Sequence, residues 1–250
     1  MALHVIIALI RKVSRCCVLT TALLSLLPLF LCFAGAPART VTTYKVSSLG
    51  ISIGDATTSQ HLSEENGHTW VSFETKARVN ASLLWFGYHL TTSEKGVLRD
   101  GVLVSYSRKG EENGSKIENE GSLQGGVFRF SVREDGVTRH VNIPRSSYDY
   151  TTMECPEAFI DFPGKVPVTL RILDVENLAV VNREYRLVAN TDCVVGGRKF
   201  PCKVVDFSDR NKSIRRWVNR DGNAIVVCRQ ESTDRKQNYS VHATAVTKEM

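Results

Sequence analysis

The sequence predicts a mainly β protein, built as a large curved antiparallel sheet or half-barrel with a short helical or irregular connector. Three observations lead to this prediction. Apolar and polar residues alternate along many segments, turn dipeptides separate these segments, and few long stretches have helical periodicity. One polar face per strand favours antiparallel pairing, because parallel strands are usually buried on both faces.

The clearest alternating segment covers residues 69–80. Val71, Phe73 and Val79 share one face of it, and Glu74 and Lys76 share the other. This pattern predicts a strand with one face on the core and one in water. Further alternating runs lie at residues 102–106, 128–132, 225–227 and 241–245.

Hairpin turns are marked by glycine pairs and by Asn-Gly or Asp-Gly dipeptides. These residues tolerate the positive φ angles that tight hairpins require. They are Asn66-Gly67, Asp100-Gly101, Asn113-Gly114, Gly125-Gly126, Asp135-Gly136, Gly196-Gly197 and Asp221-Gly222. We therefore expect sequential hairpins along most of the chain.

The chain divides into a signal peptide, residues 1–38, and a single β-rich domain, residues 39–250. Within the domain we expect an N-terminal meander to about residue 145 and a C-terminal meander over residues 168–247. The connector between them, residues 146–167, has no clear alternation and contains Pro156, Pro163 and Pro167. Such prolines break regular structure, so the connector has room for only a short helix.

The first 38 residues have the three parts of a secretory signal. A positive patch precedes an almost wholly apolar run, residues 18–33, and small residues follow it. Ala36-Pro37-Ala38 fits the cleavage rule, so the mature chain is expected to begin at Arg39 after a cut behind Ala38. The alternative is an uncleaved anchor, but the run is shorter than the roughly 20 residues of a spanning helix.

The charge excludes one class of partner. The whole chain carries a formal net charge of +6, and removing the basic residues of the signal leaves a mild excess. Nucleic-acid binding normally needs basic residues clustered on one face. We therefore expect no nucleic acid as a partner, and we interpret the basic pair Arg215-Arg216 as a solvated face.

Four cysteines follow the signal: Cys155, Cys193, Cys202 and Cys228. An even number in an exported chain indicates disulfides. Cys193 and Cys202 flank an expected hairpin tip, which favours a bridge between them and leaves Cys155 with Cys228. The alternative is that all four are free, buried thiols.

Motifs for metal binding are missing from the sequence, which contains no H-x-H, H-E-x-x-H, S-x-x-K or C-x-x-C pattern and no glycine loop for phosphate. Residues 50–54, Gly-Ile-Ser-Ile-Gly, have the letters of G-x-S-x-G, but a nucleophile of this type needs a helix directly after it, and no helix is expected there. We therefore expect no catalytic residue, no metal and no cofactor. Glu154, Glu157 and Asp161 raise the idea of paired carboxylates for glycoside cleavage. A solvated helix face is the simpler interpretation of these three residues.

An apolar segment at residues 83–90 loses the alternation. It predicts either a central strand covered on both faces or a strand with one face on an apolar groove, which is how many ligand sites are built. Because side chains alternate along strands, only part of the aromatic set can face one groove. The candidate ligand-binding residues are Trp85, Phe86, Tyr88, Phe128, Phe130 and Trp217.

Several short motifs, in this order, resemble uncharacterised families of secreted bacterial β-sheet proteins known only as domains of unknown function. The motifs lie at residues 50–54, 99–105, 112–115, 170–174, 197–202 and 217–222. The resemblance implies a strongly curved antiparallel sheet in the bacterial envelope. It is distantly similar to the half-barrels of periplasmic lipoprotein carriers, which hold acyl chains in an apolar groove, and it carries over no catalytic residues.

These observations together favour an exported, non-enzymatic protein of the periplasm or the extracellular space. Its expected role is to bind lipid or another apolar ligand, or to assist envelope assembly with envelope proteins as partners. The first alternative is a structural or partner-binding β domain without a ligand. The second alternative is a hydrolase of unknown substrate.

Overall fold

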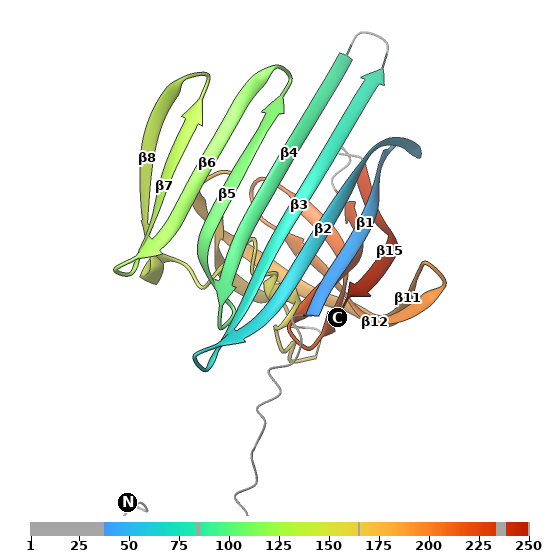
Figure 1. Cartoon of the computed structure of the whole chain (residues 1–250). Helices are drawn as coiled ribbons and strands as arrows, with labels where there is room; N and C mark the ends of the chain where they lie inside the picture. The colour runs from blue at the N-terminus through green and yellow to red at the C-terminus, as the bar shows by residue number, and fades with distance from the viewer. Residues whose placement is uncertain (1–37, 84–85, 165, 234–238, 250) are drawn as a thin grey trace, which may run out of the picture. The chain divides into compact units, whose positions relative to one another are not determined.

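A single sheet of fifteen strands forms the fold in the computed structural model, which describes residues 38–83, 86–164, 166–233 and 239–249 (Figure 1). The strand order is β8-β7-β6-β5-β4-β3-β2-β1-β15-β14-β13-β12-β11-β10-β9. Two meanders therefore meet where β1 pairs with β15. All neighbours pair antiparallel except β9 and β10, so the predicted mainly β fold with one curved antiparallel sheet is confirmed.

The first meander contains β1 to β8, drawn from blue to yellow-green in Figure 1. Its strands are β1 (Ala38–Ser48), β2 (Ile51–Glu65), β3 (His68–Leu83), β4 (Phe86–Arg99), β5 (Val102–Glu112), β6 (Ser115–Gln124), β7 (Val127–Glu134) and β8 (Val137–Pro144). Residues 1–37, which hold nearly all of the predicted signal peptide, lie outside the described part of the chain.

The second meander lies behind the first in Figure 1. It contains β10 (Val168–Asp174), β11 (Ala179–Val195), β12 (Arg198–Ser208), β13 (Ser213–Asp221), β14 (Ala224–Ser232) and β15 (Tyr239–Glu249). The segment between the two meanders holds the 3-10 turns η1 (Arg145–Ser147) and η2 (Pro156–Ala158), with the two-residue strand β9 (Tyr150–Thr151) between them. Among the described residues, no helix is long and apolar enough to cross a membrane.

Tight turns close the hairpins at nearly all of the predicted positions. Asn66 and Gly67, for example, have φ angles of 53° and 76°, as a type I′ turn requires. The turn predicted at Asp221-Gly222 is one residue later, because Asp221 pairs with Ala224 and ends β13. The sequence analysis also missed a turn at Leu49, which has a φ of 50° although leucine disfavours this region.

Bulges contribute to the curvature of the sheet, and Gly121 allows aromatic rings to pack closely on it. The register shifts between Thr43 and Tyr44 in β1, and again in four further strand pairs. A bulge bends its strand and increases the local twist. At Gly121 the neighbouring ring of Phe130 lies where a side chain would stand, which brings aromatic rings close to the backbone.

The largest core cluster joins the two meanders. Leu103, Phe128 and Phe130 of the first meander pack in one cluster with Tyr148 of the connector and Leu173 of β10. These five side chains are at most 2% exposed. The connector therefore runs inside the curved sheet and is part of the core.

The predicted environment of two carboxylates in the connector is wrong. Glu154 and Glu157 were expected on a solvated helix face, but they are 3% and 1% exposed. The two oxygens of Glu154 accept hydrogen bonds from the backbone N–H groups of Leu103 and Thr151, at 2.9 and 3.1 Å. Buried carboxylates need such partners, and the sequence does not show which backbone groups approach them.

A candidate ligand cavity inside the curved sheet

A cavity of about 430 Å³ lies between the two meanders. Its wall comes from β1 to β4, from the connector and from β13 to β15. Its apolar members are Tyr44, Ala56, Val71, Phe73, Leu98, Met153, Ile225, Val227 and Val241, and its polar members include Gln60, Glu94, Arg216 and Gln230. A mainly apolar hollow with a few polar groups is the usual form of a small-molecule site.

A second hollow of about 600 Å³ continues the first toward the turn at Asp100-Gly101. The two hollows have Val71, Leu98, Asn223 and Ile225 as common lining residues. The two hollows are therefore adjacent to each other.

Strand alternation explains why these residues line the cavity. Val71, Phe73 and Thr75 lie two positions apart on β3 and project to the same face of the sheet, as do Ile225 and Val227 on β14. The alternation in residues 69–80 thus correctly identified an inward face. It did not show that part of this face borders a hollow.

Gln60 connects the two walls of the cavity. Its side-chain oxygen accepts a hydrogen bond from the N–H of Ile225 at 3.0 Å, and its amide nitrogen donates to the carbonyl of the same residue. Ile225 has no partner on β15, because β14 pairs with β15 only through residues 229–231. Gln60 therefore satisfies a stretch of strand edge inside the protein, where unpaired backbone groups would be costly.

A charged pair forms the polar end of the cavity. Arg216 donates through Nη1 to Glu157 Oε1 and through Nε to Gln230 Oε1, the latter at 2.9 Å. Burial disfavours the charge on Arg216, but the carboxylate of Glu157 outweighs this effect and raises the arginine pKa. Burial raises the pKa of the neighbouring Cys155 thiol, which donates to Glu157 at 3.2 Å.

Glu94 lies at another part of the wall. Tyr106 donates its hydroxyl to Glu94 at 2.9 Å, and Arg108 Nε lies 3.7 Å from the same oxygen. Burial raises the pKa of Glu94, although the hydrogen bond and the nearby arginine act in the opposite direction. The cavity is thus apolar along its walls and polar at fixed places.

The aromatic residues predicted to bind a ligand do not lie together in the structure. Phe128 and Phe130 stack with their ring centres 4.6 Å apart inside the core. Trp217 packs near three cysteines, and Tyr88 donates its hydroxyl to Glu112 at 3.1 Å. None of these four lines the interior cavity. Trp85 and the side chain of Phe86 lie outside the described residues.

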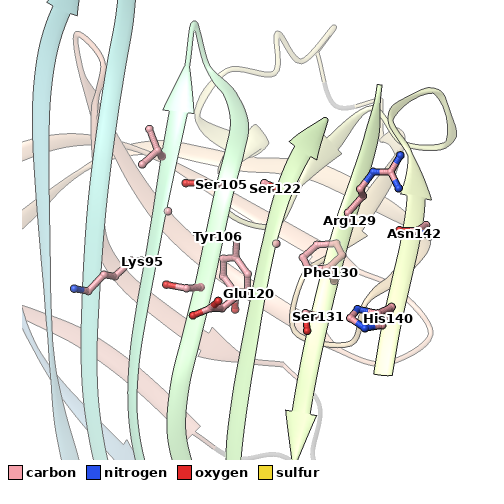
Figure 2. A pocket seen from close by; sticks show the side chains of 14 residues that line it. Lys95, Ser105, Tyr106, Glu120, Ser122, Arg129, Phe130, Ser131, His140 and Asn142 are labelled. Atoms are coloured by element: carbon pink, nitrogen blue, oxygen red, sulfur yellow. The ribbon is translucent and has the colours of Figure 1, made fainter. Parts of the chain in front are cut away.

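A separate groove of about 670 Å³ lies on β4 to β8, and Figure 2 shows its lining. Ser105, Ser107 and Ser131 belong to this lining and alternate along their strands with the core residues Tyr106 and Phe130. Most of the polar side chains of the groove are therefore on the face opposite the core, although Tyr106 and the predicted ligand-binding residue Phe130 also belong to its lining. Short polar side chains form much of it, which makes it a weaker candidate for an apolar ligand.

Sequence reasoning missed Gln60 and interpreted Glu157 and Arg216 as solvated, whereas Gln60 and Arg216 line the cavity and Glu157 is paired with Arg216. The basic pair Arg215-Arg216 was interpreted as a solvated face, which is correct only for Arg215, whose partner is Asp206 at 2.7 Å. Arg216 is 20% exposed and faces inward with Ile214 and Val218. An arginine on the apolar face of an alternating strand was the signal that could have identified it.

The four cysteines of the described residues are free thiols in the structure. Cys202 Sγ lies 3.4 Å from Cys228 Sγ, and Cys193 lies close to both. Cys155 is outside this group and contacts Glu157 and Arg216, so the structure does not place it beside Cys228 as the predicted pairing requires. A bridge from Cys193 to Cys202 stays a prediction, and thiol counting on unfolded, unreduced protein tests it.

Comparison with known proteins identifies a structural neighbour. No protein-family model and no curated protein matches the chain. A β-barrel-like protein of the domain of unknown function DUF1849 from Brucella abortus is similar in structure, with a TM-score of 0.55 and 11% sequence identity. The match covers 85% of this chain and 98% of that protein. The resemblance to uncharacterised bacterial β-sheet domains is thereby confirmed at the level of the fold.

Proposed function

We propose that this protein is exported and binds an apolar ligand, such as a lipid acyl chain, in the interior cavity without catalysing a reaction. The observation that carries the proposal is the hollow of about 430 Å³ between the two meanders, with its mainly apolar wall. Its volume lies within the roughly 300–1,000 Å³ range of small-molecule sites. The proposed ligand site is therefore this cavity and not the aromatic residues that the sequence suggested.

The energetics favour a chain-like apolar ligand. Each methylene that leaves water for the cavity contributes about 0.8 kcal/mol, and part of this gain is offset by the lost freedom of the ligand. Arg216 and Gln230 are bonded to each other and to Glu157 or Tyr239, and they still make one place on the wall polar, where a headgroup is better accommodated than an acyl chain. An amphipathic ligand therefore fits better than a purely apolar one.

The carboxylates considered for glycoside hydrolysis are already engaged within the protein. Glu154 accepts two backbone hydrogen bonds, and Glu157 is paired with Arg216. Both groups stabilise the buried connector. These bonds support a binding role in preference to a hydrolase.

Export to the periplasm or the extracellular space is the second part of the proposal. The N-terminal sequence supports it, and the described part of the sheet begins with β1 at Ala38. A cut behind Ala38 would leave β1 almost complete. N-terminal sequencing of the exported protein should give Arg39 as the first residue, whereas a start before residue 18 would indicate an uncleaved anchor.

A fluorescent fatty-acid probe tests the binding proposal. Val227→Phe adds a ring inside the cavity, and we expect it to weaken probe binding at least tenfold relative to the unmodified protein. The matched control is Val137→Phe, which places the same ring at a residue that is 71% exposed and should leave binding unchanged. Circular dichroism confirms that each variant is folded.

The outcomes separate the two main interpretations. If the unmodified protein binds no probe, the ligand proposal fails, and a structural or partner-binding role takes its place. Equal loss of binding in both variants would show that the probe does not occupy the cavity.

A further inference from the structure

Three thiols come together at one end of the second meander, outside the ligand cavity. The sulfur atoms of Cys193, Cys202 and Cys228 all lie within 4.8 Å of one another. Cys202 and Cys228 are buried, and Cys193 is partly exposed. The grouping is notable because the three residues come from three different strands.

A bulge in β14 and the β11–β12 hairpin, whose tip lies against β15, bring the three thiols together. Trp217 pairs with Arg229 and Val218 pairs with Val227, which leaves Cys228 as the extra residue of a bulge in β14. Bulges re-aim side chains and are frequent beside functional sites. Cys193 and Cys202 come from the β11–β12 hairpin.

The tip of this hairpin lies against β15. A β-carbon added at Gly196 would stand 3.5 Å from the carbonyl oxygen of Thr244. The hairpin is therefore folded onto the same part of the sheet that carries Cys228. Val195, Phe200 and Val226 pack around the thiols and shield them from water.

The spacing of the sulfur atoms suits a soft metal ion. Bonds of about 2.3 Å from a metal to three thiolates place the sulfur atoms roughly 3.8–4.0 Å apart. The separation of 3.4 Å between Cys202 and Cys228 and the 4.8 Å limit for the cluster bracket this value. Small side-chain movements are enough to reach it.

We propose that Cys193, Cys202 and Cys228 form a three-thiolate binding site for a thiophilic metal ion, with Cu(I) as the best fit. Thiolate ligands select Cu(I) and Zn(II) over harder ions. No fourth histidine, cysteine, aspartate or glutamate joins the group in the described part of the chain. Cu(I) accepts three sulfur ligands, whereas Zn(II) needs a fourth ligand, which only solvent near Cys193 could supply.

Protons must leave when the ion binds. Burial raises the pKa of Cys193 to about 12, so this thiol is protonated at neutral pH in the empty site. Cysteine binds a metal ion as the thiolate, so binding releases protons. Arg229 lies over the Trp217 ring at 4.8 Å. Its positive charge favours the thiolate form of Cys193 and so offsets part of the cost of removing the proton from this thiol.

A competition titration tests the proposal with the whole protein, reduced and kept free of oxygen. Cu(I) is offered together with a chromogenic Cu(I) chelator. We expect one ion per chain and at least roughly tenfold weaker binding for Cys193→Ser, Cys202→Ser and Cys228→Ser, because loss of even an outer-shell partner costs about 10–100-fold. Cys155→Ser is the matched control and should bind as the unmodified protein does.

X-ray absorption on the unmodified, copper-loaded protein gives an answer that does not depend on the variants. The site predicts three sulfur neighbours around copper. The proposal is overturned if the reduced protein releases all copper to the chelator, if copper has no sulfur neighbours, or if Cys155→Ser binds as weakly as Cys228→Ser. A Cys202–Cys228 disulfide in protein purified without reductant, together with no copper binding after reduction, would assign the cluster to a disulfide instead.

Discussion

The close packing of aromatic rings over Gly121 gives a direct test of how the core packs against the sheet. A β-carbon at this position would stand 2.5 Å from the ring of Phe130 and 2.8 Å from the ring of Phe128. Both rings are at most 2% exposed and stack on each other, so neither can move aside easily. Overpacking of this kind costs about 1–3 kcal/mol.

Gly121→Ala should therefore destabilise the protein. The loss of about 1–3 kcal/mol is reduced by about 0.4–1 kcal/mol, because alanine restricts the unfolded chain. Gly87→Ala is the matched control. Nothing lies within 4 Å of the added carbon, so only the stabilising restriction of the unfolded chain remains. Urea unfolding followed by tryptophan fluorescence should show a lower midpoint for Gly121→Ala and an equal or higher one for Gly87→Ala, with unchanged slopes. Equal midpoints for the two variants would refute the packing argument.

Three further predictions concern single side chains. Leu49→Asn should stabilise the protein by about 0.5–1 kcal/mol in urea unfolding, because leucine is costly at the positive φ of this turn; an unchanged midpoint would count against this. Glu157→Ala should cost about 3 kcal/mol or somewhat less, since it leaves Arg216 in the interior with Gln230 and the weakly accepting sulfur of Cys155 as acceptors, and a loss below 1 kcal/mol would mean that the pair is solvated. Burial raises the pKa of Glu94 above its usual value of 4.5, so its contribution to stability is full below about pH 4.5 and is lost as the pH rises through the folded-state pKa. Urea midpoints measured between pH 4 and 8 should show this decrease, and Glu94→Gln should flatten it; the same slope in both proteins would contradict the assignment.

Local patterns in the sequence predicted the strands and most of the turns. Alternation such as that around Val71 and Phe73 depends only on which face of a strand is buried, and turn dipeptides such as Asn66-Gly67 depend only on local φ angles. Both signals are present in a few neighbouring residues. The curved antiparallel sheet could therefore be predicted without knowledge of distant contacts.

The cavity and the thiol cluster could not be predicted in the same way. Gln60 meets Ile225 only because β1 pairs with β15 and the sheet curves, and a bulge sets the position of Cys228. A bulge shifts the register by one residue and leaves no clear sign in the alternation. Aromatic content was also a poor guide, since large rings such as Phe128 are the residues that fill a core best.

The central claim is that the interior space between the two meanders holds an apolar ligand, and the most direct measurement is mass spectrometry of lipids that co-purify with the exported protein. The cavity predicts a defined class of acyl-chain molecule, at up to about one per protein chain, bound to the unmodified protein and to Val137→Phe. The same molecule should be strongly depleted in Val227→Phe, because the added ring narrows the cavity. Lipid-free protein, or an identical lipid content in Val227→Phe, would contradict the account.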